Sequence, residues 1–417
     1  MALSNNGYLA IKRQTISTPQ TAVVPTHPLR FNEGDLMLEQ ENIEIESVQN
    51  NAFPTAMVKG MQKPTGEWKC DLDANECVHI LAGALGTITS STDVSSGTDA
   101  SVFSHQIDYS ATPPYFSIEQ ARGSLTDTGN NSTRFEVRRA FGAQIDSFTI
   151  KGGNSGKIEF SWKIQALGIF HRAKVLKDAA AGSSVAIAVD TVEGLVATTD
   201  SVNTYDDTPQ NEIDAIASFS TTAKTVTIAT LANSYTVANN AMLYLQPQTV
   251  SYSVAEQVFT NADVEFREST TYSGAASASE GNLENWELTF NNNLDARAGS
   301  LRKGNYIVAP TKRGVTLKFT KYFETRMDAD RYFNATKRGM EIIIQSDVII
   351  SATDTAAKRF KITIALSDVR FKSHKMSTSY GELYAYDVEA ICLYDASDTR
   401  AIRITVVNGS AGTVYTA

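Results

Sequence analysis

Apolar and polar residues alternate with a period of two through most of this chain. The alternation is clearest in residues 148–150, 158–164, 286–290 and 315–320. A period of two places the apolar side chains on one face of a strand and the polar side chains on the other. We therefore predict a mainly β protein whose sheets bury one face and expose the other to water.

The composition supports packed cores and excludes several classes of protein. Hydrophobic residues make up 42% of the 417 residues, which is enough to build cores and too much for a disordered chain. The longest apolar runs fall far short of the ~20 residues that a membrane-spanning helix needs, and the first residues lack the pattern of a signal peptide. Three cysteines, Cys70, Cys77 and Cys392, cannot form a disulfide framework, so we expect reduced thiols and folding in a cytoplasm.

The composition changes between residues 174 and 250, which are rich in Ala, Ser, Thr and Val. Residues 184–189, 225–229 and 242–245 are predicted strands. From residue 178 onward this segment has one base, Lys224, and carries most of the formal net charge of −9. Its acids are Asp178, Asp190, Glu193, Asp200, Asp206, Asp207, Glu212 and Asp214. Because such a segment is well solvated and adds little to a common core, we predict a small all-β insert at 174–250 that faces outward.

Two helices interrupt the predicted strands. In residues 73–86, Asp73 can cap the first turn, Glu76 can reach back to it and Gly86 can close the helix. In residues 325–339, Thr325 or Asp328 can start a helix that Gly339 ends.

Each predicted helix follows the same order of elements, which indicates an internal repeat. The first copy has residues 41–51, a loop to Gly60 and residues 66–72, and the second has residues 284–293, a loop to Gly304 and residues 314–319. We predict two tandem β-sandwich or partial-barrel units, each with one short helix, at 36–173 and 251–408. An N-terminal arm at 1–35 and a C-terminal tail at 409–417 flank them.

The opening of the chain resembles the tail tube proteins, or major tail proteins, of long-tailed bacteriophages. The resemblance rests on Gly7-Tyr-Leu-Ala-Ile-Lys-Arg-Gln-Thr, Thr18-Pro19-Gln-Thr, Glu41-Asn-Ile-Glu and Gly60. The closing block is similar to the same family in residues 261–266, 283–293, 304–308, 316–320 and 328–339. The resemblance covers everything except the insert and the extreme ends.

The resemblance implies a structural virion protein. Six units of this fold form a ring whose sheets join into one barrel around a DNA-conducting lumen, and rings stack into a tube. Two units in one chain then imply a trimeric, pseudo-sixfold ring, with a true hexamer as the alternative. A ring also pairs sheet edges that would be an aggregation hazard in a lone monomer.

The partners that the resemblance implies are other copies of the chain, the tape measure, tail terminator and distal tail proteins, and double-stranded DNA in transient, non-specific passage, without a membrane. The location is the virion tail, assembled in the host bacterial cytoplasm. Two other classes of protein remain alternatives. One is a decoration or carbohydrate-binding virion protein that acts through the insert, and the other is a tail-borne glycosidase.

The motifs that could indicate catalysis, a cofactor or a metal have simpler structural explanations. Cys70, Cys77 and His79 lack the spacing of a standard zinc site, and we expect two buried thiols and a histidine on the helix surface. Residues 152–157 lack phosphate-loop spacing and are predicted to form a hairpin turn.

Charged clusters are also explained without a binding site. Asp328 and Asp330 could be a glycosidase pair, but acids in the first turn stabilise a helix. The acids of the insert lack EF-hand register. A basic group is expected to pair between subunits or face water, and consists of Arg297, Arg302, Lys303, Lys312, Arg313, Lys318 and Lys321. We therefore predict no enzyme, no cofactor and no metal site.

Two sets of residues are candidates for assembly and passage of DNA. The loops 50–63 and 291–303 stand at equivalent places in the repeat and are predicted to contact the next ring. Their named residues are Asn50, Asn51, Lys63, Asn291, Asn292, Asn293, Arg302 and Lys303. Basic linings would hold DNA phosphates, so we predict an acidic lumen that includes Glu44 and Glu46, which otherwise form the wet face of an outer strand.

Overall fold

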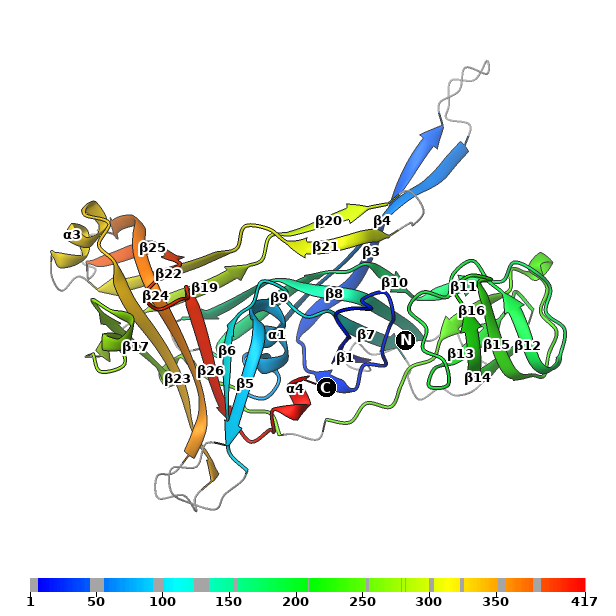
Figure 1. The fold of residues 1–417 in the computed structure, drawn as a ribbon, viewed down its shortest axis with the longest axis horizontal. Coiled ribbons are helices and arrows are strands. Elements are labelled where there is room, and N and C mark those ends of the chain that lie inside the picture. Colours follow the sequence, from blue (N-terminus) through cyan, green and yellow to red (C-terminus); the bar gives the residue numbers. More distant parts are fainter. Residues whose placement is uncertain are drawn as a thin grey trace.

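The computed structural model describes residues 7–45, 56–92, 101–123, 135–153, 156–208, 210–252, 255–278, 280–281, 283–299, 304–322, 326–351, 358–377 and 384–416. The protein is mainly β with antiparallel sheets, as the alternation predicted. Figure 1 shows two β units side by side and a smaller β insert at one end of the molecule.

One continuous sheet of antiparallel strands joins the two units. Its order is β3 (Glu33–Ile45), β4 (Ala56–Asp71), β9 (Glu159–Gln165), β8 (Phe135–Gly152), β19 (Asn285–Asn291), β22 (Gly314–Tyr322), β25 (Ala385–Leu393) and β24 (Lys358–Ser377). The first four strands belong to the first unit and the last four to the second. The units therefore meet where β8 pairs with β19. We call this arrangement the joint sheet.

Two long strands, β8 and β24, pass from the joint sheet into a second layer. The first half of β8 pairs with β7 (Phe116–Gly123), which is followed by β1 (Gly7–Arg13) and β2 (His27–Leu29), while β10 (Gly168–Phe170) lies on the other side of β8. Each unit is therefore a sandwich, closed along one side by a strand that belongs to both layers.

The second layer of the second unit is larger. The first half of β24 pairs on one side with β23 (Arg338–Ser351), which continues into β17 (Val264–Ser269) and β18 (Glu280–Gly281). On its other side lie β26 (Ile402–Asn408), β6 (Phe103–Tyr109) and β5 (Gly86–Thr92). The hairpin β5–β6 comes from the first half of the chain, so the two units are interlocked.

Matching irregularities in the two units agree with the predicted tandem repeat. The ladder between β8 and β9 shifts between Ile145 and Ser147, and the ladder between β24 and β25 shifts between Phe371 and Ser373. The ladders β7–β8 and β23–β24 also shift at matching places. Because β-bulges bend strands at fixed positions, shared bulges indicate equivalent geometry.

Helices α1 (Cys77–Leu85) and α3 (Met327–Phe333) follow β4 and β22, as the repeat predicted. Two details of the caps were wrong. Glu76 does not reach back to the helix, because its carboxylate accepts hydrogen bonds from the backbone and guanidinium of Arg30. Gly339 does not end α3, because the helix stops at Phe333 and Gly339 lies in β23. Two further single turns are α2 (Tyr272–Ala275) and α4 (Thr413–Thr416), and η2 (Val237–Asn239) and η3 (Asn261–Asp263) are 3₁₀ turns.

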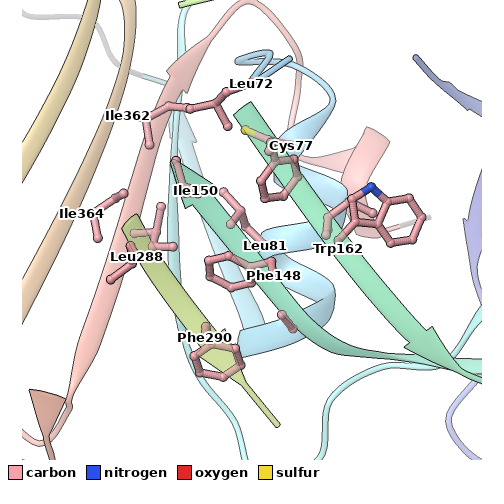
Figure 2. Close-up of a cluster of buried hydrophobic side chains, with 14 of the residues drawn as sticks. Leu72, Cys77, Leu81, Phe148, Ile150, Trp162, Leu288, Phe290, Ile362 and Ile364 are labelled. Carbon is pink, nitrogen blue, oxygen red and sulfur yellow. The ribbon is translucent and has the colours of Figure 1, made fainter. Parts of the chain in front are cut away.

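The main core surrounds α1, whose residues are all buried. A helix that is apolar all round packs on every side, and here it fills the space between the layers of both units. The helix contacts β5, β6, β8 and α4, and the same buried cluster includes side chains of β9, β19, β24 and β26. Figure 2 shows Leu72, Cys77, Leu81, Phe148, Ile150, Trp162, Leu288, Phe290, Ile362 and Ile364.

The insert is a separate six-stranded sheet. Its order is β11 (Arg172–Lys174), β16 (Met242–Leu245), β13 (Ser201–Tyr205), β14 (Asn211–Ser220), β15 (Thr225–Leu231) and β12 (Gly182–Ala188). The three strands predicted in this segment are present as β12, β15 and β16. The insert was expected to add little to a common core. Its buried cluster nevertheless includes Tyr8, Ala10, Ala121 and Val137 of the first unit. The insert is therefore packed firmly on the outer face of β1, β7 and β8.

Two hairpins extend from the joint sheet at its upper edge in Figure 1. The outer parts of β3 and β4 form an arm that projects away from the body. The hairpin of β20 (Leu294–Ala298) and β21 (Asn305–Pro310) joins β19 to β22 and lies against the first unit, where Leu294 and Val308 pack on Phe141 and Leu167.

His79 of α1 gives a test of this core. Its ring is buried between His27 and Tyr415, with ring centroids 4.9 and 4.7 Å away, rather than lying on the helix surface as predicted. Burial lowers the pKa of His79 to about 3. The folded state therefore resists binding a proton that the unfolded chain accepts below pH ~6.5.

We predict that His79→Gln flattens the loss of stability in acid. Above pH ~6.5 His79 is neutral in the folded and the unfolded chain. Below that pH the unfolded chain binds a proton at His79, so the free energy of unfolding falls by about 1.4 kcal/mol per pH unit. The wild type therefore loses about 2 kcal/mol relative to the variant by pH 5. Urea unfolding of both proteins between pH 5 and 8 measures the difference. Burial raises the pKa of Glu76 to about 7, so protonation of Glu76 stabilises the fold as the pH falls. Both proteins contain Glu76, so this effect cancels in the comparison. A difference that does not change with pH would contradict the assignment.

Candidate assembly surfaces

The joint sheet exposes one face that is polar and charged along its whole width. Alternate residues of each strand point away from the core, so this face carries Thr149, Thr289, Ser161 and Thr316 between its charges. The acids on it include Glu33, Asp35, Glu39, Glu67, Asp71, Glu159, Glu287, Asp387 and Glu389, and the lysines include Lys63, Lys69, Lys151, Lys163, Lys318, Lys372 and Lys375.

Many of these charges form pairs between neighbouring strands. Lys163 lies 2.9 Å from Glu67, and Lys318 lies 3.3 Å from Glu287 at the corresponding place in the second unit. Lys69 also pairs with Glu33 at 3.1 Å. Exposed pairs of this kind add little stability, typically below ~1 kcal/mol. Their effect is that Lys69, Lys163 and Lys318 already have carboxylate partners.

The joint sheet has an open edge at each end. β3 pairs with β4 on one side only. The second half of β24 pairs with β25, and the ladder to β23 on its other side ends at Val369. Within the described residues no strand pairs with the outer side of β24 beyond that point. Open edges of this kind invite pairing with another chain.

The arm carries the exposed apolar side chains of the first predicted stacking loop. Ile43 faces Val58 across the arm, both are nearly half exposed, and Met57 is more than half exposed. Lys63 lies lower in β4, opposite Glu39. Asn50, Asn51 and Glu46 lie outside the described residues.

The second predicted stacking loop is divided between the core and the surface. Asn292 is fully buried, and its side chain donates to Ala84 O at 3.0 Å and to Ile145 O at 2.8 Å. Asn293 adopts a left-handed backbone, and Asn291 accepts a hydrogen bond from its N–H. Asn292 therefore belongs to the fold, and the exposed part of this segment is the hairpin β20–β21. Arg302 and Lys303 lie outside the described residues.

Glu44, one of the predicted lumen acids, is exposed on β3 in the arm, opposite Met57. It lies beyond the part of β3 that belongs to the joint sheet. The structure instead places other acids, such as Glu67 and Glu287, on the sheet face. The sequence does not single these acids out, because the exposed positions of their strands also carry Thr, Ser and Lys.

A buried charged cluster joins the insert to the first unit. The guanidinium of Arg139 is fully buried and forms ion pairs with Glu119 and Asp200, both at 2.6 Å. Tyr8 donates to the other oxygen of Glu119, and the backbone N–H of Gln248 donates to Tyr8 Oη at 2.8 Å. Burial alone would lower the pKa of Arg139, but the two carboxylates raise it, so the guanidinium stays charged.

This cluster was not predicted from the sequence, although a signal for it was present. Arg138 and Arg139 are consecutive residues of one strand, so their side chains point to opposite faces. With a core on one side and the insert on the other, one arginine had to be buried. Asp200, expected to be a solvated acid, is its partner.

Several other acids of the insert act as local caps. Asp206 accepts the backbone N–H of Thr208 at 2.9 Å, and Glu212 accepts those of Ala232 and Asn233. Among the residues that the structure describes, no group of three or more His, Cys, Asp or Glu could hold a metal ion. In the same part of the chain, no helix has the length and apolar composition that crossing a membrane requires.

The remaining motifs have structural roles in the described chain. Asp328 pairs with Arg331 at 2.5 Å, and Asp330 with Arg326 at 3.6 Å, at the start of α3. Burial raises the pKa of the Cys77 thiol. The predicted turn at 152–157 lies between the antiparallel strands β8 and β9, and its residues 154–155 lie outside the described residues.

Several of the predicted basic residues pair within the chain rather than forming a patch. Arg297 pairs with Asp295, and Lys321 lies 3.6 Å from Asp328. Arg313 stacks on the ring of Tyr109 at 4.4 Å and donates to the carbonyl of Ser110.

Comparison with known proteins identifies one family for this chain. The family model described as phage tail tube protein matches residues 4–216, which is half of the chain. The chain therefore belongs to the phage tail tube protein family, and the resemblance noted in its residues is confirmed. It is a structural component of a phage tail. No curated protein matches the chain.

We predict that Arg139→Met destabilises the protein by about 3–5 kcal/mol, because it leaves two carboxylates buried without a cation. Thermal or urea unfolding measures this change. Arg297→Met is the matched control, since Arg297 forms an exposed pair with Asp295 and its loss is expected to cost less than ~1 kcal/mol. Equal effects of the two substitutions would show that the buried cluster does not anchor the insert.

Proposed function

We propose that this chain forms rings that stack into the tail tube and conduct DNA from the capsid to the host cell. The observation that carries the proposal is the joint sheet, in which two equivalent units already pair edge to edge through β8 and β19, with an open edge left at each end. Repeating that pairing between copies closes a ring. Because each chain supplies two units, three chains supply the six units that the family resemblance implies.

The exposed face of the joint sheet lines the lumen in this proposal. Its acids outnumber its lysines, and pairs such as Lys163–Glu67 and Lys318–Glu287 keep lysines engaged. DNA carries a negative charge every ~1.7 Å of its axis, so free lysines around the lumen would bind it at many points. A mildly acidic lining with paired lysines lets DNA pass. Substituting Glu67 and Glu287 by Gln should slow DNA ejection from assembled particles, and unchanged ejection would count against this lining.

The remaining parts of the proposal follow from the structural family. The protein acts without catalysis or a cofactor. Its partners are other copies of itself, the tape measure, tail terminator and distal tail proteins, and DNA in transit. It assembles in the host cytoplasm and functions in the virion.

Electron microscopy of the purified chain tests the proposal. We expect tubes of regular width, and discrete monomers at every concentration would contradict it. The arm is expected to bridge stacked rings, because Ile43, Met57 and Val58 expose apolar surface away from the body. Replacing residues 43–58 by Asn-Gly keeps the paired residues Asn42 and Lys59 and joins them by a two-residue turn. This variant should form rings but not tubes, and normal tubes would show that the arm does not stack them.

We also propose that the insert faces outward from the tube wall. It lies at one end of the molecule and packs on β1, β7 and β8, away from the exposed face of the joint sheet. Replacing residues 177–246 by a Gly/Ser linker, together with Tyr8→Ser to reduce the apolar surface that this uncovers, should leave narrower tubes. Loss of tubes by a variant that remains folded would place the insert in the wall.

A further inference from the structure

The internal seam between β8 and β19 specifies how two copies of the chain pair. We infer that the outer edge of β3 pairs with the second half of β24 of another copy, antiparallel, with Met37 opposite Lys375. This inference rests on the proposed ring and adds its residue register. The occupant of each open edge is therefore a second copy of the same chain.

The register follows from counting across the joint sheet. In the first unit, Ser147 after the bulge leads through Lys163 and Glu67 to Asp35. In the second unit, the equivalent path leads from Ser373 through Glu389 and Lys318 to Glu287. β3 is thus equivalent to β19, with Asp35 in the place of Glu287, and β24 is equivalent to β8, with Ser373 in the place of Ser147.

The internal seam then transfers directly to the edges. At the seam, Thr289 lies opposite Thr149, with their hydroxyl oxygens 3.1 Å apart. The equivalent residues are Met37 of one copy and Lys375 of the other. By the same count Leu38 lies opposite His374, where Phe290 stacks on Phe148 at the internal seam.

Side chains at the two edges are complementary in this register. The exposed face of β3 carries Asp35 and Glu39, which become the diagonal neighbours of Lys375. Diagonal neighbours on one face of a sheet are within reach of long side chains. Gln40 is equivalent to Asn292, whose side-chain amide donates to Ile145 O at the end of the internal seam. Both edges therefore carry a carboxamide at this place.

Of the strands that the structure describes, none pairs with the outer edge of β3, but three side chains cap its backbone at Gly34 and Leu36. Gln120 accepts the N–H of Leu36 at 2.8 Å, Arg138 donates to the carbonyl of Leu36 at 2.7 Å, and Arg122 donates to that of Gly34. We call Gln120, Arg122 and Arg138 the edge cap. Polar side chains turned toward an edge are a known protection against unwanted pairing.

The second unit shows what the edge cap replaces. Gln120 of β7 lies opposite Arg138 of β8, two residues beyond the bulge in that ladder. The equivalent residues of the second unit, Ile342 of β23 and Ile364 of β24, are both apolar. There the edge of β19 is already occupied by β8 and needs no cap. Since the N–H of Leu36 can donate to only one acceptor, Gln120 must release it when the second copy pairs.

Disulfide trapping tests the register. In chains carrying Met37→Cys and Lys375→Cys, the two cysteines of one chain lie on opposite ends of the joint sheet, so oxidation should link different chains into covalent dimers and trimers. The same assay with Met37→Cys and Ser373→Cys, two residues out of register, should give severalfold less product. Thr149→Cys with Thr289→Cys is the positive control, since it should close within one chain.

The outcomes separate this inference from the proposed function. Tubes that form without the disulfide between positions 37 and 375, or that link better at position 373, would overturn the register and leave the ring proposal standing. Absence of rings and tubes in the unsubstituted chain would overturn both. The native thiols interfere little, because burial raises the pKa of Cys70, Cys77 and Cys392.

The edge cap is tested by the concentration at which tubes appear. Gln120→Leu removes the acceptor for Leu36 and should lower that concentration severalfold, whereas Gln120→Glu keeps an acceptor and adds charge pairing to the arginines, and should raise it. Gln144→Leu is the control, because Gln144 is as buried but donates to Pro113 O away from the edge. An unchanged concentration in both Gln120 variants would show that the edge cap does not govern pairing.

Discussion

The backbone pairing of β8 with β19 is the interaction on which the rest of the molecule depends. It turns two sandwiches into one sheet and leaves a single core around α1. Backbone hydrogen bonds that are left unmade in a buried place cost more than made ones gain, so a seam of this kind is strongly specified. The seam also fixes the spacing between the units, and with it the curvature that a ring of such sheets would have.

Much of the fold could be predicted from the alternation of residues, but its connections could not. Residues 148–150 were recognised as a strand, yet they are only the end of the long strand β8, which crosses from one layer to the other. Local alternation reports the face of a strand and not the layer in which it lies. The repeat was also recognised, but Glu41 was aligned with Glu284. The ladders instead align Glu33 with Asn285, because the arm adds residues that the second unit lacks.

The candidate surfaces were predicted less well than the fold, for a physical reason. Asn292 lies in an Asn-rich segment that is typical of an exposed loop, but its carboxamide is buried and donates to two carbonyls at the seam. Arginine is usually exposed, but Arg139 can be buried because Glu119 and Asp200 form ion pairs with it. Whether a polar residue is solvated or buried depends on partners far away in the chain, which no local pattern contains.

The hairpin β5–β6 sets an order of events for the folding of this chain. β6 pairs with β26, so Ile107 meets Ile404 almost at the end of the sequence. During synthesis the second layer of the second unit cannot close until nearly all of the chain has left the ribosome. Contacts this distant in sequence make folding slow, and they also delay completion of the open edge at β24. A nascent chain on a crowded polysome thus lacks one half of the proposed pairing surface until translation ends.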